Sequence, residues 1–168
     1  MPRPERRPRA SAKRALSHVG RDGRARMVDV SGKPITARQA VARGRIRIAP
    51  AALRLARSGR LAKGGVIEVA RLAGVLAAKR TAEAIPLCHA LLLTHVDVDL
   101  WPRRDGFEIE ARVRTDAGTG AEMEALHAVA VAALTVYDMV KAADRAMTID
   151  AIRVVKKTGG RSRAYRRR

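Results

Sequence analysis

An apolar stretch from Gly120 to Arg145, GAEMEALHAVAVAALTVYDMVKAADR, constrains the fold of this chain more than any other feature. Glu122 and Glu124 stand near its beginning, apolar residues fill its middle, and no Gly or Pro interrupts it after Gly120. Because Ala, Leu, Met, Glu and Lys favour helix, the stretch predicts one helix of about six turns. Its middle is apolar all round, so this helix is expected to be buried on most sides.

Polar residues mark both ends of this predicted helix. Acidic residues at the start interact favourably with the positive end of the helix dipole. This effect is sufficient to explain their position without any function. Asp138 and Lys141 are three residues apart at the other end and share a face. Glu124 and Asp138 are separated by about 21 Å along the axis. One small molecule cannot touch both ends of the same helix, so a site that uses both requires two copies of the chain.

The size and composition of the chain limit what it can be. Its 168 residues fit a single domain, and 47% hydrophobic residues with only 2% aromatic ones predict a core of Ala, Val, Leu and Ile. Cys88 is the single cysteine, which excludes an intrachain disulfide and a cysteine-based metal site. No apolar run reaches the roughly 20 residues that span a bilayer, and no apolar segment follows Arg6-Arg7. We therefore expect a cytoplasmic protein with no membrane partner.

The formal net charge of +19 is concentrated at the two ends of the chain. Residues 1–26 hold nine basic and two acidic residues, and residues 156–168 hold seven basic residues and no acidic one. Such tails fit either nucleic-acid contact or solubilising ends. We favour solubilising ends, because few aromatic rings are available to stack on bases. The predicted organisation is a disordered basic tail at 1–24, one domain at 25–158 and a basic tail at 159–168.

The order of predicted elements indicates the fold class. The elements are a strand at 45–48, a short helix at 50–57, a long helix at 66–83, hairpin strands at 94–100 and 107–114, the helix described above, and a strand at 147–157. This order is that of an α+β, ferredoxin-like (split βαβ) antiparallel sheet with two long helices on one face. Residues 26–33 are interpreted as a short strand or an ordered arm. The hairpin charges are interpreted as a solvated face, and another copy of the chain is expected to cover the open face of the sheet.

Several single features are ambiguous when they are considered alone. Lys63 and two glycines precede the helix at 66–83, which fits an anion site but also a plain helix start. His89 fits a hydrogen-bonded structural histidine as well as a catalyst. Cys88 alone fits a small buried apolar residue.

Eight segments taken together are far more specific, and they resemble the MoaC family, the cyclic pyranopterin monophosphate synthases of molybdenum cofactor (molybdopterin) biosynthesis. The segments are Arg26–Ser31 (RMVDVS), Lys63-Gly64, Ala70–Val75 (ARLAGV), Ala77–Thr81 (AAKRT), Ile85–His89 (IPLCH), Thr119–Leu126 (TGAEMEAL), Val131–Met139 (VAALTVYDM) and Lys141-Ala142. The resemblance extends from about Arg26 to Ser162, so only the tails fall outside it.

The resemblance implies a cytoplasmic lyase with a small-molecule substrate. This substrate is the cyclised dihydro-GTP triphosphate made by a radical SAM GTP cyclase, and the product is cyclic pyranopterin monophosphate with release of pyrophosphate. The family has a ferredoxin-like fold and assembles as a homohexamer, a trimer of dimers, with its site at a dimer interface. Neither a cofactor nor a metal is implied as part of the site, and nucleic acid is not an expected partner.

The resemblance also assigns roles to residues of this chain. The implied catalytic pair is Asp138 and Lys141, which we interpret as a proton-transferring couple. The implied substrate-binding residues are Leu87, Cys88, His89, Met123 and Glu124, with Glu122, Lys63 and Lys157 as further site residues and Arg38 as an additional candidate. The chain departs from the family pattern at three positions, with Gly65 in place of Asp, Ala90 in place of Pro, and Arg161 in place of Lys.

Two other interpretations of the sequence compete with an active synthase. A nucleic-acid-binding α+β protein would use the basic tails, but it would place aromatic side chains on the central strands, and the predicted hairpin strands offer only Phe107. An inactive relative that assembles without catalysing the reaction would have the same fold. Assay of the purified protein with the cyclic dihydro-GTP intermediate distinguishes both from an active synthase.

Overall fold

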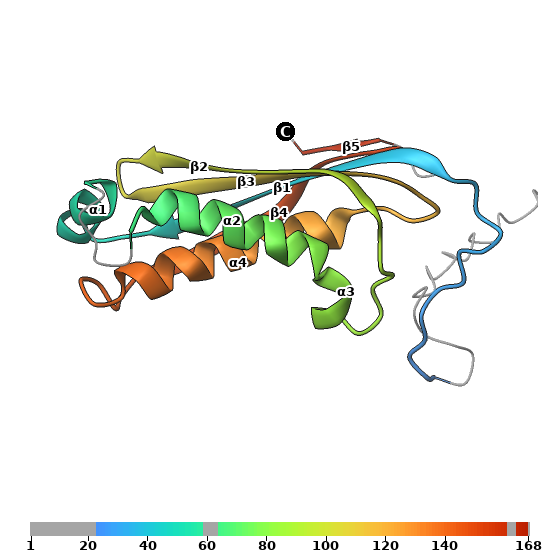
Figure 1. Cartoon of the computed structure of the whole chain (residues 1–168), viewed down its shortest axis with the longest axis horizontal. Coiled ribbons are helices and arrows are strands. Elements are labelled where there is room, and N and C mark those ends of the chain that lie inside the picture. Colours follow the sequence, from blue (N-terminus) through green and yellow to red (C-terminus); the bar gives the residue numbers. More distant parts are fainter. Residues whose placement is uncertain (1–22, 59–63, 161–163, 168) are drawn as a thin grey trace, which may run out of the picture.

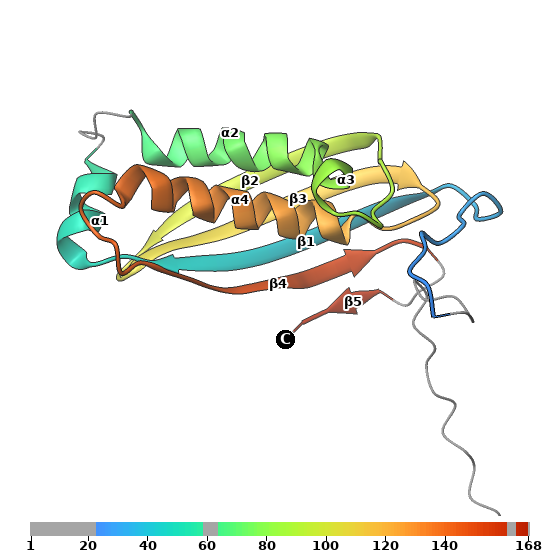
Figure 2. The same ribbon diagram turned by 90° about the horizontal axis from the view of Figure 1, so that it is seen from below.

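The computed structural model describes residues 23–58, 64–160 and 164–167, and these form a layer of helices on an antiparallel sheet. The elements are β1 (Thr36–Arg47), α1 (Pro50–Arg57), α2 (Val66–Lys79), α3 (Thr81–Ala84), β2 (Leu93–Arg103), β3 (Gly106–Ala117), α4 (Glu122–Val140), β4 (Thr148–Thr158) and β5 (Tyr165–Arg166). The sheet order is β2-β3-β1-β4-β5. Figures 1 and 2 show α2 and α4 side by side on one face, running in opposite directions, while the other face is open. The predicted ferredoxin-like α+β fold is confirmed.

The core lies between the sheet and the two long helices. Alternate residues of β1 and β3 point towards the helices, among them Ile46, Phe107 and Ile109, which are fully buried. Small side chains let the two helices approach closely. A Cβ added to Gly74 of α2 would lie 3.0 Å from the carbonyl oxygen of Ala128 on α4. The Ala-rich composition of α4 therefore serves close packing rather than helix propensity alone.

Several element boundaries differ from those predicted. The helix α4 ends at Val140, and residues 141–143 continue as turns. A carboxylate oxygen of Asp144 then accepts the backbone N–H of Ala49 at 2.7 Å, so the chain after α4 is tied to the start of α1. The strand β1 is longer than predicted and begins at Thr36. The long helix at 66–83 is divided at Arg80 into α2 and α3.

Two predicted segments are only partly described. Most of the N-terminal tail predicted to be disordered lies outside the described residues. Residues 26–33 form an extended arm without a regular strand. In the C-terminal tail, Tyr165 and Arg166 form the short strand β5, which pairs with Lys156 and Lys157 of β4. The sequence analysis did not predict this strand.

The prediction that the hairpin charges form a solvated face is wrong for Glu110. This side chain points to the open face of the sheet, yet it is only 3% exposed. It forms ion pairs with Arg43 on β1 and Arg112 on β3, whose long side chains cover it. Arg112 also binds Asp97 on β2 at 3.0 Å. The open face therefore carries a connected network of charges instead of separately hydrated side chains.

The prediction that α4 is buried on most sides is confirmed, and the exception is one outer stripe. Leu134 of α4 is 57% exposed, and Leu72 and Leu76 of the neighbouring α2 are 60% and 44% exposed. The inner residues of α4 are fully buried against the sheet. By length and composition α4 could cross a membrane, but half of the relevant window is buried inside the protein. Its position identifies it as the core helix of the domain.

Candidate functional site

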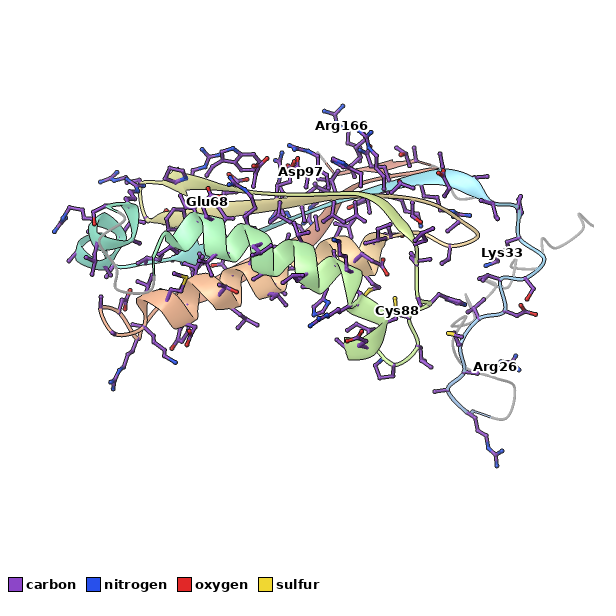
Figure 3. The ribbon with its side chains drawn as sticks, viewed as in Figure 1. Arg26, Lys33, Glu68, Cys88, Asp97 and Arg166 are labelled. Carbon is purple, nitrogen blue, oxygen red and sulfur yellow. The ribbon has the colours of Figure 1, made fainter. Side chains whose placement is uncertain are left out.

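A cavity of about 490 Å³ opens at the amino-terminal end of α4, on the side where the arm and the last strands meet. We call it the Lys157 cavity. Its lining residues are Lys33, Pro34, Thr36, Arg38, Gly118, Thr119, Gly120, Glu122, Lys157 and Gly160. Three basic side chains therefore face one acidic side chain. Figure 3 shows Lys33 and Cys88 at this end of the molecule.

Contacts between distant segments hold the charged groups of the cavity in place. Lys157 of β4 forms an ion pair with Glu122 in the first turn of α4. The guanidinium of Arg38 donates through Nε to the carbonyl oxygen of Ala117 at 2.7 Å. Gly160 has a φ of 76°, and a Cβ at this position would collide with that guanidinium. Glycine at 160 therefore satisfies both a left-handed backbone and a close approach to Arg38.

The arm before β1 is attached to the same end of the molecule. His89 lies with Nε2 2.8 Å from the carbonyl oxygen of Val28. Because a carbonyl can only accept, Nε2 carries a proton and donates it to Val28. Further along, the arm turns through a 3.0 Å hydrogen bond from the N–H of Lys33 to Val30, and the turn packs against Gly118. The arm thereby brings Lys33 to the cavity.

Glu124 is the buried carboxyl of this end. It is 2% exposed, and the Cys88 thiol donates to its Oε1 at 3.5 Å, whereas Oε2 has no hydrogen-bond partner among the described residues. Burial is the main cause that raises the pKa of Glu124. Burial and the nearby carboxyl also raise the pKa of Cys88 to about 11, so the thiol stays protonated and acts as a donor. The orphaned oxygen is an acceptor that a ligand can satisfy.

Asp138 and Lys141 form the second polar group, at the opposite end of α4. Their side chains make an ion pair of 2.7 Å and are 55% and 54% exposed. The hydrogen bond to Asp138 is the main cause that raises the pKa of Lys141. In a single chain the pair is thus a charged ion pair beside solvent, with Lys141 held in its protonated form.

The structure brings some predicted site residues together and separates others. Cys88, His89, Glu122, Glu124 and Lys157 gather at the amino-terminal end of α4, together with Arg38. Leu87 is half-buried beside them on the loop after α3, and Met123 is 38% exposed on the outer side of α4. Asp138 and Lys141 lie one helix length away, as the course of α4 in Figure 2 shows. Lys63 lies outside the described residues.

Two cavity residues were not identified from the sequence. Lys33 was not singled out, although it lies only two residues after the RMVDVS segment. Thr36 was not considered, yet its buried hydroxyl has no hydrogen-bond partner in the described part of the chain and lines the same cavity. In the sequence, only the short distance of these two residues from the RMVDVS segment could have indicated their role. That distance does not indicate which side chains point into the cavity.

The chemistry of the cavity suits a phosphorylated small molecule. Lysine and arginine side chains make strong charge-assisted hydrogen bonds to phosphate oxygens, and carboxyl oxygens accept the N–H groups of a purine-derived ring. Within residues 23–58, 64–160 and 164–167, no three His, Cys, Asp or Glu side chains converge as a metal site would require.

Comparisons with known proteins find a relationship over nearly the whole chain. The sequence model of the MoaC family matches residues 27–160. A protein of Thermomicrobium roseum named cyclic pyranopterin monophosphate synthase is 61% identical over 154 residues, covering 90% of this chain and 93% of that protein. Proteins with the same name from Chloroflexus aggregans and Parvibaculum lavamentivorans are 57% and 54% identical, and cover 90% and 92% of this chain. The matched segments cover 93% and 98% of those two proteins.

Proposed function

Because this chain belongs to the MoaC family, we propose that it is a cyclic pyranopterin monophosphate synthase, a lyase of molybdenum cofactor biosynthesis. It converts the cyclised dihydro-GTP intermediate, supplied by a radical SAM cyclase in the cytoplasm, into cyclic pyranopterin monophosphate and pyrophosphate. The observation that carries this proposal is the Lys157 cavity, where three cations face the carboxyl group of Glu122 at the end of α4 that also holds the buried Glu124.

The cavity and the neighbouring Glu124 offer separate groups for the two parts of the substrate. Lys33, Arg38 and Lys157 bind the triphosphate and stabilise the charge that develops on the departing pyrophosphate. Glu124 contributes its unpartnered Oε2 to the N–H groups of the purine-derived ring. Substrate binding satisfies a buried oxygen that otherwise lacks a partner, which favours a ring with donors at that position over one without them.

The proton-transferring groups come from a second copy of the chain. Asp138 and Glu124 are separated by about 21 Å along α4, so one chain cannot offer both to one substrate. The outer stripe of α4 consists of the exposed residues Met123, Leu134 and Asp138 and the half-buried His127 and Ala130, at helical spacing. A second copy packed on this stripe in the opposite direction brings its own Asp138 and Lys141 to the Lys157 cavity. The full assembly is a homohexamer, a trimer of such dimers.

Within the assembled site, Lys141 and Asp138 move protons during ring opening and closure. The pair keeps Lys141 protonated before the reaction, so it begins as the acid. Transfer of a proton to the substrate leaves a neutral amine, which serves as the base in the following step. In the assembled site, neighbouring cations and the exclusion of water by the second chain oppose the effect of Asp138, which raises the pKa of Lys141.

The test is turnover of freshly prepared intermediate by Asp138→Ala and Lys141→Ala proteins. Loss of a general acid–base group should lower kcat by about 10²-fold or more, with little change in substrate binding. Arg54→Gln, which alters an exposed basic residue of α1 that the proposed mechanism does not use, is the control and should match the wild type. Turnover close to the wild-type rate in both alanine variants would refute the assignment of the pair.

A further inference from the structure

The open face of the sheet carries a second basic cavity that the proposed reaction does not use. It has a volume of about 530 Å³, and we call it the β5 groove. Its lining residues are Gln39, Val41, Arg43, Glu110, Arg112, Arg114, Val155, Lys156, Arg166 and Arg167. Lys156 and Lys157 are neighbours in β4 and point to opposite faces of the sheet, so the groove is separate from the Lys157 cavity.

The acidic residue of the groove is already neutralised. Glu110 is bound by Arg43 at 2.5 Å and also by Arg112. The four remaining basic residues are Arg114, Lys156, Arg166 and Arg167, and none of them makes an ion pair with a carboxylate of the described residues. The groove therefore has four positive charges without a counter-charge from the part of the chain that the structure describes.

The strand β5 places like charges opposite one another. In the antiparallel register of β4 and β5, Arg166 lies directly across from Lys156, and the backbone N–H of Arg167 donates to Val155 at 2.9 Å. Like charges at directly opposed positions destabilise a sheet. The pairing is only two residues long, so little else favours it. Figure 3 shows Arg166 projecting from the open face. A local conflict of this kind is expected at a ligand site, where a bound anion relieves the repulsion.

We propose that the β5 groove binds an oligophosphate anion of the size of pyrophosphate. Guanidinium groups bind phosphate oxygens in pairs, and a lysine adds a compact charge. A short phosphate chain concentrates several negative charges within the small groove, matching the cations on β3, β4 and β5. Both pyrophosphate and the phosphate chain of a nucleoside triphosphate have this chemistry. The proposal goes beyond the synthase activity, and it gives the basic C-terminal segment a role other than solubility.

The lining of the groove favours a small anion over nucleic acid. Recognition of single-stranded nucleic acid combines basic side chains with aromatic side chains that stack on bases. None of the residues that line the β5 groove is aromatic. Tyr165 of β5 is 46% exposed but does not line the groove. A ligand held through phosphate alone fits these residues best.

Calorimetric titration of the full chain with inorganic pyrophosphate, and separately with GTP, tests the proposal. The wild type should bind pyrophosphate in two classes, at the groove and at the Lys157 cavity. Lys156→Gln with Arg166→Gln should weaken the groove class about tenfold or more, since two charge-assisted contacts are lost. Arg54→Gln with Lys79→Gln removes the same charge from exposed positions elsewhere and should leave both classes unchanged. Lys157→Gln should weaken only the binding of pyrophosphate at the Lys157 cavity.

Each outcome of this experiment is decisive. A loss of groove binding for pyrophosphate, GTP or both in the double variant supports the proposal, and the comparison of the two ligands shows which source of phosphate is preferred. Binding equal to that of the control variant overturns it. Binding of poly(U) RNA that the double variant loses, without any binding of pyrophosphate or GTP, also overturns it. Circular dichroism verifies that the variants are folded, and wild-type synthase turnover in the double variant separates this proposal from the proposed function.

Discussion

Among single residues, Glu124 connects burial to pH dependence most directly. Burial raises its pKa above the ordinary value of 4.5, so the folded chain holds this proton more tightly than the unfolded chain. Glu124 therefore has a lower pKa in the unfolded chain and a higher pKa in the folded chain. Between these two pKa values the folded state binds more protons than the unfolded state, so the free energy of unfolding falls as pH rises. Glu124→Gln cannot titrate and lacks this loss. The stability of the wild type relative to Glu124→Gln should therefore fall as pH rises above about 4.5, as measured by urea unfolding at a series of pH values.

Cys88→Ala provides the matched comparison for that measurement. The thiol hydrogen bond lowers the pKa of Glu124 and partly opposes the effect of burial. Without the thiol, the pKa of Glu124 should rise further, and the loss of stability should extend to higher pH. A stability difference between wild type and Glu124→Gln that stays constant with pH would contradict the assigned burial.

In the synthase assay, Glu124→Gln should raise KM, because the purine-derived ring of the substrate loses its hydrogen-bond acceptor.

Ala151 is a residue whose backbone conformation conflicts with its side chain. It has a φ of 55°, the left-handed region that glycine adopts without cost, and it lies in β4 where the register with β1 shifts between Arg43 and Arg45. Ala151→Gly should increase the free energy of unfolding by about 1 kcal/mol, as measured by urea denaturation.

Ala37→Gly is the control for this prediction. Ala37 is also exposed and lies in the regular strand β1, where glycine should lower the free energy of unfolding by roughly 0.5–1 kcal/mol. If both substitutions destabilise the protein equally, the strain assigned to Ala151 is absent in solution.

At the scale of elements, the outer stripe of α4 makes a prediction about assembly. Leu134 lies in the middle of this stripe and is 57% exposed in the single chain. Leu134→Glu should leave the chain folded, because the side chain contributes little to the core. It should dissociate the assembly, because a carboxylate would be buried between two copies, and turnover should be lost with it. Light scattering after size-exclusion chromatography measures the dissociation.

The conservative substitution Leu134→Met is the control for the assembly prediction. It retains an apolar side chain of similar volume, so assembly and turnover should both persist. An assembled and active Leu134→Glu protein would show that the stripe is not a contact between copies and would remove the support for a shared site on this face.

The elements with clear chemical boundaries were the ones that the sequence predicted best. The helix α1 matches its prediction from Pro50 to Arg57, because proline and Ser58-Gly59 mark its two ends. The hairpin was predicted from alternation, although both strands are longer than expected. The strand β1 was largely missed, because a central run of Ala40, Val41 and Ala42, all buried, breaks the alternation of apolar and polar residues.

For the site, the specific segments predicted a set of candidate residues but not how these residues are arranged. The ion pair of Lys157 with Glu122 joins β4 to α4, and no local pattern indicates that these two segments meet. The burial of Glu124 depends on the loop that carries Cys88. Lys33 reaches the cavity only because the arm is held by His89 and Gly118. Such contacts arise from tertiary structure, which periodicity does not encode.

At the scale of the whole molecule, the two groups of site residues lie at opposite ends of one rigid helix. The helix α4 is 19 residues long, so its ends cannot approach each other without unfolding the core. A site that had only the proposed substrate-binding groups, or only the proposed proton-transferring pair, would not complete the reaction. If both groups act on one substrate, as we propose, this distance makes assembly a requirement of catalysis, and a two-fold related pair of chains forms two complete sites at once.

Mixing two impaired variants, with turnover measured at a substrate concentration well below KM, tests this arrangement directly. If Asp138 and Glu124 act from different chains, an Asp138→Ala chain paired with a Glu124→Gln chain forms one intact site and one doubly altered site. Random reassociation after joint unfolding and refolding makes half of the dimers mixed, so turnover should recover to about one quarter of the wild-type value. Each variant refolded alone should remain at its own low rate. Were both residues drawn from the same chain, every site in the mixture would carry one substitution and no recovery would occur.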